Sequence, residues 1–172
     1  MILLCISPTD NAPKIIIWKA IMRIGLISDT HGLLRKSAVN ALKAADIIIH
    51  AGDIDTPDVL TQLSAIARVY PVRGNMDRHP EMKYLPEYEI VEAGGIFLYV
   101  IHDLMTMDFD PAAGMDVVVS GHSHVPKVEY RGRVLYINPG SAGPRRFSLP
   151  LSVGMLEIKG GKITPQIIEL DG

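Results

Sequence analysis

Cysteine is nearly absent from this chain of 172 residues, in which Cys5 is the single thiol. One thiol can form neither an internal disulfide nor a cysteine-based zinc site, so the fold has to depend on a packed core. A chain of this length can bury such a core as one domain. Sparse cysteine is also typical of a reducing compartment, and we expect the protein to be cytoplasmic.

Long hydrophobic runs are also missing. No apolar run approaches the roughly 20 residues that a membrane-spanning helix needs. The short apolar run at 2–6 is followed by a stretch with Asp10, Asn11 and two prolines, whereas a secretory leader needs about 7–15 unbroken apolar residues. We therefore predict neither a membrane partner nor a leader peptide.

Neither sign of charge dominates the sequence. It has 17 Lys and Arg against 19 Asp and Glu, a formal net charge of −2. Nucleic acids and anionic membranes bind proteins with a basic face, so the composition argues against both. A small phosphorylated substrate remains compatible, because it needs only local positive charge, which metal ions can supply.

The first half of the domain alternates between two kinds of pattern. Apolar runs at 23–28, 46–50 and 68–72 predict buried strands, and the helical spacing of apolar residues at 33–45 and 57–67 predicts two helices. Strands that alternate with helices indicate a parallel sheet with right-handed crossovers.

The second half is rich in hairpin signals. A further buried strand is predicted at 115–120, and three pairs of apolar runs flank glycine-containing turns. We predict an α/β fold in which a parallel first sheet packs on a hairpin-rich second sheet, with helices outside. The three hairpins are at 89–101, 125–137 and 151–170.

Five predicted strands end in polar residues that could bind a metal, and ligands of open α/β sheets bind outside such strand ends. Oxygen and nitrogen donors suit Mn, Fe, Zn or Ni. Seven such donors are too many for one ion but suit two ions that share a carboxylate and clamp a phosphoryl group. The donors are Asp29, His31, Asp53, Asn75, His102, His122 and His124.

Three of these residues also have a plain structural interpretation. Asp29 and Asp53 could cap helices, and Asn75 could occupy a turn. Capping does not explain His122 and His124, which stand one residue apart beside a glycine. Taken together, the set favours metal binding.

The same residues carry a family resemblance, in their order and spacing. From about residue 22 to 170 the chain resembles the calcineurin-like metallophosphoesterases, in particular their small single-domain phosphodiesterase branch. The resemblance implies a four-layer α-β-β-α sandwich of two mixed sheets. The motifs are Asp29-Thr30-His31-Gly32, Gly52-Asp53, Gly74-Asn75, His102, Gly121-His122-Ser123-His124 and Asn138-Pro139-Gly140-Ser141.

The resemblance also implies a role for each donor. Two divalent cations would bind, manganese by preference with nickel, zinc or iron as alternatives, and a hydroxide between them would attack phosphorus in line. Asp53 would bridge both cations, and Asp53 and Asn75 would be the catalytic residues. The first cation would be held by Asp29, His31 and His124, and the second by Asn75, His102 and His122.

Other residues of the site are less well defined by the sequence. Arg73, Arg145 and Arg146 are candidates for binding the substrate phosphate, although exposed arginines are commoner. Met76 follows Asn75 and cannot deliver a proton, so Asp77, His79 or water would protonate the leaving group. We therefore hypothesise a preference for good leaving groups.

The predicted function is a metal-dependent phosphoesterase, most specifically a phosphodiesterase of a small phosphorylated substrate. The alternative is a metal-binding scaffold for protein partners that has lost turnover, since fold does not guarantee function. A mildly positive mean hydropathy of +0.21 is compatible with a homo-oligomer. We divide the chain into an extension at 1–21, explained by a misassigned start or an extra strand, and a domain at 22–172.

Overall fold

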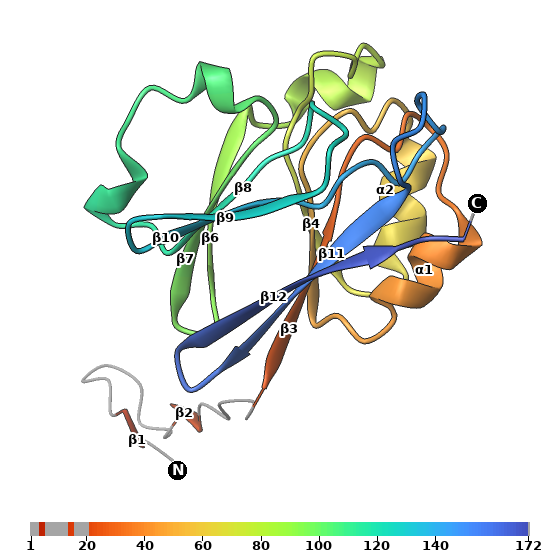
Figure 1. Cartoon of the computed structure of the whole chain (residues 1–172). Coiled ribbons are helices and arrows are strands. Elements are labelled where there is room, and N and C mark those ends of the chain that lie inside the picture. The colour runs from red at the N-terminus through yellow and green to blue at the C-terminus, as the bar shows by residue number, and fades with distance from the viewer. Residues whose placement is uncertain (1–3, 6–13, 16–20, 172) are drawn as a thin grey trace.

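The computed structural model describes residues 4–5, 14–15 and 21–171, and two five-stranded sheets packed face to face dominate it (Figure 1). The first sheet has the strand order β12-β11-β3-β4-β5. Its β3 (Met22–Ile27), β4 (Ile47–His50) and β5 (Arg68–Pro71) are parallel, as predicted. The predicted helices connect them as α1 (Lys36–Leu42) and α2 (Pro57–Ser64), each shorter than its apolar pattern.

The third predicted hairpin does not belong to the second sheet. Strands β11 (Ser152–Lys159) and β12 (Lys162–Glu169) extend the first sheet, where β11 runs antiparallel to β3. The first sheet is therefore mixed and not purely parallel. Burial on both faces explains the placement, because most of β11 is buried between the two sheets on one side and α1 on the other.

The second sheet has the strand order β6-β7-β8-β10-β9. Both remaining hairpins form as predicted, and β8 lies between them, parallel to β7 and to β10. The strands are β6 (Tyr88–Ala93), β7 (Ile96–Ile101), β8 (Val117–Val119), β9 (Lys127–Arg131) and β10 (Val134–Asn138).

Apolar cores lie on both faces of the first sheet. One lies between the sheets and includes Leu26, Leu98 and Leu135, and the other lies between the first sheet and its helices and includes Leu42 and Leu63. Each fully buried side chain of this size stabilises the fold by about 1.5–3 kcal/mol. In the described residues the outer layer on the second sheet consists of short 3-10 turns, η2 (Leu104–Thr106) and η3 (Pro111–Ala113). A further 3-10 turn, η1 (Pro80–Tyr84), follows β5.

The carboxyl ends of the central strands meet at one rim of the sandwich. In the first sheet Ile27, His50 and Pro71 are register partners, so β3, β4 and β5 end level with one another. In the second sheet Val100 pairs with Val119, so β7 and β8 end together as well. The segments that follow these strands therefore share one edge of the molecule.

Residues near the N-terminus add one small element. β1 (Leu4–Cys5) and β2 (Lys14–Ile15) pair with each other antiparallel. Most of the predicted extension at 1–21 lies outside the described residues, and its origin stays a prediction. No helix in the described part of the chain is long and apolar enough to cross a membrane.

Candidate metal centre

The rim brings the predicted donors together in two overlapping groups. The ligand atoms of Asp29, His31 and His124 lie within 4.8 Å of one another, and so do those of Asp29, Asp53 and His102. The first group is the set that the resemblance implied for one cation. Asp29 belongs to both groups, a position for which the resemblance had proposed Asp53.

Asp53 nevertheless lies between the two histidine sets. Its Oδ2 is 3.8 Å from His31 Nε2 and 3.4 Å from His102 Nε2. Asn75 joins the second set, since its Oδ1 lies 3.1 Å from His102 Nε2 and 3.0 Å from His122 Nδ1. The structure therefore places all the predicted donors at one site, although His122 is exposed.

Two buried atoms of the predicted ligands make no hydrogen bond, although one of them, Asp29 Oδ1, lies 3.3 Å from His124 Nε2. Among the described residues, Asp29 Oδ1 and His124 Nδ1 are buried without a hydrogen-bond partner. Orphaned buried polar atoms are costly in a folded protein unless something binds them. Carboxylate, amide and imidazole ligands without thiolate suit hard to borderline divalent cations. The residues present therefore fit two divalent metal ions.

The backbone at the site is unusual. Five of the seven donors have a positive φ between 45° and 66°, a left-handed conformation that side chains with a Cβ seldom adopt. Such strain persists only where the surrounding structure enforces it, and it concentrates at functional sites. The five residues are Asp29, His31, Asp53, His122 and His124.

Two glycines allow the loops to approach each other. A Cβ on Gly74 would collide with the backbone nitrogen and the Oδ1 of Asp53, and one on Gly121 would collide with the Ser28 hydroxyl. The Ser28 hydroxyl donates to Asp29 Oδ2 at 2.7 Å, and the His122 N–H donates to the same oxygen at 3.2 Å. Close backbone packing thus orients both carboxylates.

The carboxylates of Asp29 and Asp53 have pKa values shifted in opposite directions. Burial raises the pKa of Asp29 to about 6, and the hydrogen bond from Ser28 only partly opposes it. Burial also acts to raise the pKa of Asp53, but hydrogen bonds from His102 and the Met76 N–H outweigh it and leave that pKa below its ordinary value. Asp53 is therefore the stronger anion of the pair.

The pKa values of His124 and His102 are also shifted in opposite directions. Burial, followed by the charges of Arg146 and His31, lowers the pKa of His124 to about 4. Burial acts to lower the pKa of His102 as well, but its contact with Asp53 raises it above the ordinary value. His124 is thus neutral at physiological pH, and neutral imidazole is the form that binds metals.

Asp77 supports the site and is not a free proton donor, contrary to one sequence-based candidate role. Its carboxylate is buried and accepts four backbone N–H groups, which come from Asp53 at 3.1 Å and from Ile54, Asp55 and Gly74 at 2.7 Å each. It therefore locks the loop that follows β4 against the loop that follows β5.

The three candidate arginines lie in different surroundings. Arg73 lines the hollow beside Asn75 and pairs with Glu87. Arg145 is exposed, whereas its neighbour Arg146 places Nη2 3.4 Å from His31 Nε2. The sequence could not separate the two arginines, because they are adjacent in a segment without regular structure.

Two supporting residues had weak signals in the sequence. Asp55 Oδ2 lies 3.3 Å from His31 Nδ1, and the alternation of Asp53 and Asp55 after a strand was the available clue. Asn138, in the late motif, donates from Nδ2 to the Gly121 carbonyl at 2.6 Å. It thereby fixes the loop that carries His122 and His124.

Comparison with known proteins shows the family of the chain. A sequence profile of the calcineurin-like phosphoesterase superfamily domain matches residues 22–161. The chain belongs to this superfamily. It is 36% identical over 160 residues to a probable metallophosphoesterase of Methanothermobacter thermautotrophicus, across 86% of this chain and 92% of that protein.

Two further proteins are similar to the chain, one in sequence and one in structure. Phosphodiesterase YfcE of Escherichia coli K12 is 28% identical over 161 residues, covering 79% of this chain and 88% of its own. The structure of vacuolar protein sorting 29 from Cryptosporidium parvum superposes with a TM-score of 0.70 at 20% identity, over 90% of this chain and 100% of that one. The latter likeness shows the fold alone.

Proposed function

We propose that this metallophosphoesterase is a binuclear phosphodiesterase that hydrolyses small phosphodiesters. The observation that carries the proposal is the position of Asp53, whose Oδ2 lies within 3.8 Å of a histidine from each of the two donor sets. Asp53 would bridge two divalent cations, with Asp29, His31 and His124 on one side and Asn75, His102 and His122 on the other. The ions would make a shared water acidic enough to attack phosphorus at neutral pH.

Other residues of the protein would position the metal ligands and contact the substrate. The Asp77 and Asn138 hydrogen bonds hold the donor loops in place, so little reorganisation is needed when substrate binds. Asn75 stands at the exposed side of the centre, where its amide could contact a phosphoryl oxygen. Arg73, which lines the same hollow, could contact the substrate, and the same role is retained as a proposal for Arg145.

Several finer assignments also stay proposals. Manganese is our preferred cation, and the donor chemistry suits zinc, nickel or iron equally well. A cytoplasmic location and a homo-oligomeric state remain predictions.

The test is hydrolysis of bis-p-nitrophenyl phosphate and p-nitrophenyl phosphate by metal-stripped protein with Mn, Ni, Zn or Mg added back. We expect metal-dependent turnover that favours the diester and that falls at least about 100-fold in Asp53→Asn, because the bridging carboxylate is lost. Asp58→Asn, an exposed aspartate on α2, is the matched control and should retain full activity. Turnover independent of metal would refute the proposal.

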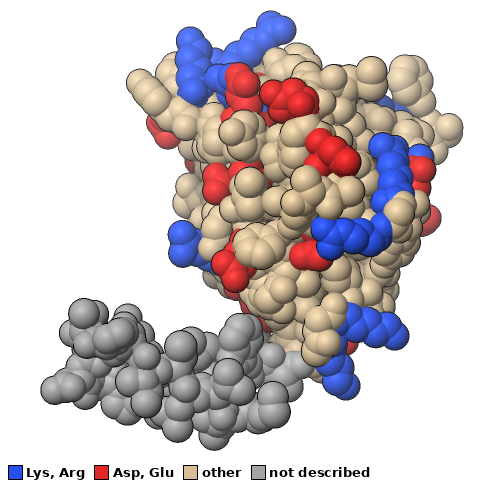
Figure 2. All heavy atoms as spheres, turned by 90° about the vertical axis from the view of Figure 1, so that its left-hand side faces the viewer, with Lys and Arg blue, Asp and Glu red and all other residues tan. Residues whose placement is uncertain are grey.

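A protein-binding scaffold is the second candidate, and one observation favours it. The outer face of the second sheet exposes Tyr88, Ile90 and Phe97 by 56%, 48% and 42%. Acidic and basic side chains are interspersed with uncharged surface on the side of the molecule in Figure 2, so no single sign of charge dominates there. Two metal ions bound per chain without turnover of any phosphoester would favour the scaffold.

A further inference from the structure

Three hollows follow one another along the rim of the sandwich. The middle hollow is lined by Asn75, His102 and His122, which belong to the candidate metal centre. It shares Arg73 and Asn75 with the hollow on one side, and it shares His122 with the hollow on the other. If a diester binds at the metal centre, each of its two ester groups can therefore enter one of the two flanking hollows.

The hollow beside Asn75 has an excess of positive charge. It is lined by Arg73, Arg78 and Lys83, and its acidic residue, Asp77, is already satisfied by four backbone N–H groups. Arg73 pairs with Glu87. Arg78 and Lys83 are exposed, and their side chains make no ion pair within the described part of the chain. Two positive charges are thus free to bind an anion.

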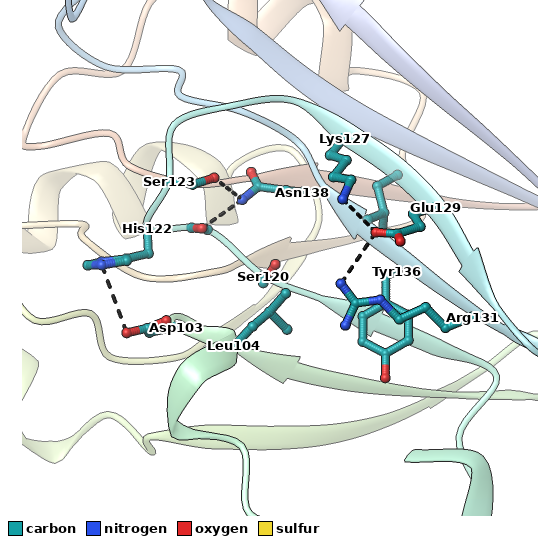
Figure 3. Close-up of a pocket in the computed structure, with 12 residues that line it drawn as sticks. Asp103, Leu104, Ser120, His122, Ser123, Lys127, Glu129, Arg131, Tyr136 and Asn138 are labelled. Carbon is teal, nitrogen blue, oxygen red and sulfur yellow. Dashed lines mark hydrogen bonds and ion pairs between the residues drawn. The ribbon is translucent and has the colours of Figure 1, made fainter. Parts of the chain in front are cut away.

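The hollow on the other side is different in charge and size. Figure 3 shows Lys127 and Arg131 both directed at Glu129, with nitrogen–oxygen distances of 2.6 and 3.3 Å. Arg131 also lies over the ring of Tyr136, 4.2 Å from its centroid. The cations here are engaged by neighbours, and the hollow measures about 140 Å³. It suits a small uncharged group.

We infer that the substrate is a phosphodiester that carries a second phosphate, bound in a cationic subsite formed by Arg73, Arg78 and Lys83. The inference rests on the proposed phosphodiesterase function, and it adds the substrate class. The scissile phosphate lies at the metal centre, the second phosphate lies beside Asn75, and a small uncharged group enters the hollow at Tyr136. Arg78 and Lys83 are positioned for binding and not for chemistry.

Binding to the Mn-loaded protein tests the subsite independently of turnover. The probes are thymidine 3′,5′-bisphosphate and thymidine 5′-monophosphate, and calorimetry gives the ratio of their dissociation constants. We expect the bisphosphate to bind about tenfold more tightly at low salt, since two exposed ion pairs contribute up to about 1 kcal/mol each. The preference should shrink as ionic strength rises, because exposed charges are screened.

The variant that tests the assignment is Arg78→Gln/Lys83→Gln, in which the ratio should fall to about one. The control is Lys159→Gln/Lys162→Gln, which removes two exposed lysines at the distant β11–β12 turn and should leave the ratio unchanged. Equal binding of the two probes by the wild type, or a preference that survives in Arg78→Gln/Lys83→Gln, would overturn the subsite.

A second measurement separates failure of the subsite from failure of the proposed function. The substrates are the 5′-(4-nitrophenyl phosphate) esters of thymidine, with and without a 3′-phosphate. The expected result is a higher kcat/KM for the 3′-phosphorylated ester, lost in Arg78→Gln/Lys83→Gln. Equal kcat/KM values would count against the subsite. Absence of turnover for both esters would count against the phosphodiesterase, whereas the binding ratio would still decide the subsite.

Discussion

The carboxylate of Asp77 accepts the backbone N–H of Asp53 at 3.1 Å, so a buried acid on one loop holds the central acid of the metal centre on another. The same carboxylate accepts the N–H of Gly74, which precedes Asn75. Two strands of the first sheet thereby deliver their donors in one fixed relationship. These hydrogen bonds fix the position of Asp53 relative to Asn75.

Asp77→Asn should disturb both stability and metal binding. An amide has one oxygen and one NH₂ group, so part of the four N–H groups would face a donor instead of an acceptor. Each unsatisfied buried group costs about 1–3 kcal/mol, and we expect unfolding free energy to fall by about 2–4 kcal/mol. Urea unfolding measures this loss, and calorimetry with Mn²⁺ should show weaker binding.

The matched control for that variant is Asp110→Asn. Asp110 is exposed and accepts a single backbone N–H, from Ala112 at 2.9 Å. Its replacement should change the unfolding free energy by less than about 1 kcal/mol. Equal losses in the two variants would contradict the role that we assign to Asp77.

Gly74→Ala should damage the centre by steric means. The added Cβ would collide with the Asp53 backbone nitrogen and Oδ1, so the two loops must separate. Overpacking of this kind costs about 1–3 kcal/mol. We expect a fall in phosphodiesterase kcat/KM of at least about tenfold, because misplacing a catalytic group by about 1 Å can reduce rates about 100-fold. Gly114→Ala adds a methyl that meets no atom within 4 Å, and its activity should remain normal.

The rate of hydrolysis should depend steeply on the leaving group. Met76 cannot donate a proton, and Asp77 is occupied by four backbone N–H groups. Without protonation by a side chain, the leaving oxygen departs with developing negative charge. A series of methyl aryl phosphates should give log kcat values that decrease as the pKa of the phenol rises. A flat plot would show that a proton donor does act.

His50 should make the folded protein sensitive to acid. It is fully buried, with Nε2 3.0 Å from the Thr30 hydroxyl, and burial lowers its pKa to about 3. The unfolded chain binds a proton near pH 6.5 and the folded one does not, so stability present above pH 6.5 is lost as pH falls towards 3. The expected loss between pH 7 and pH 5 is about 2 kcal/mol.

Replacement isolates this contribution from those of other groups. Urea unfolding of wild type and His50→Gln at both pH values, with a chelator present, yields the difference in pH dependence. The glutamine does not titrate, so its unfolding free energy should fall by about 2 kcal/mol less over the same interval. Identical pH dependence in both proteins would show that His50 is already charged in the folded state.

The sequence by itself determined where the strands end and which residues follow them. The apolar runs that precede Asp29, Asp53 and Asn75 could be recognised in the sequence. Strands that are buried on both faces consist mostly of apolar residues, and polar residues follow where the chain leaves the sheet. The shared rim then followed from parallel connectivity. The meeting of these three residues at one edge was therefore predictable without knowledge of any distance, whereas metal binding by the donor set stays a prediction.

Only the tertiary structure decided which neighbours those elements have. The hairpin of β11 and β12 joined the first sheet, because a run of apolar residues specifies burial but not a partner strand. The four N–H groups that donate to Asp77 come from two loops that are distant in the sequence. The sequence therefore gave no sign that these groups meet at one carboxylate. The contact of Arg146 with His31 likewise depended on the path of the backbone in three dimensions, since adjacent residues of one type are equivalent until the backbone directs them apart.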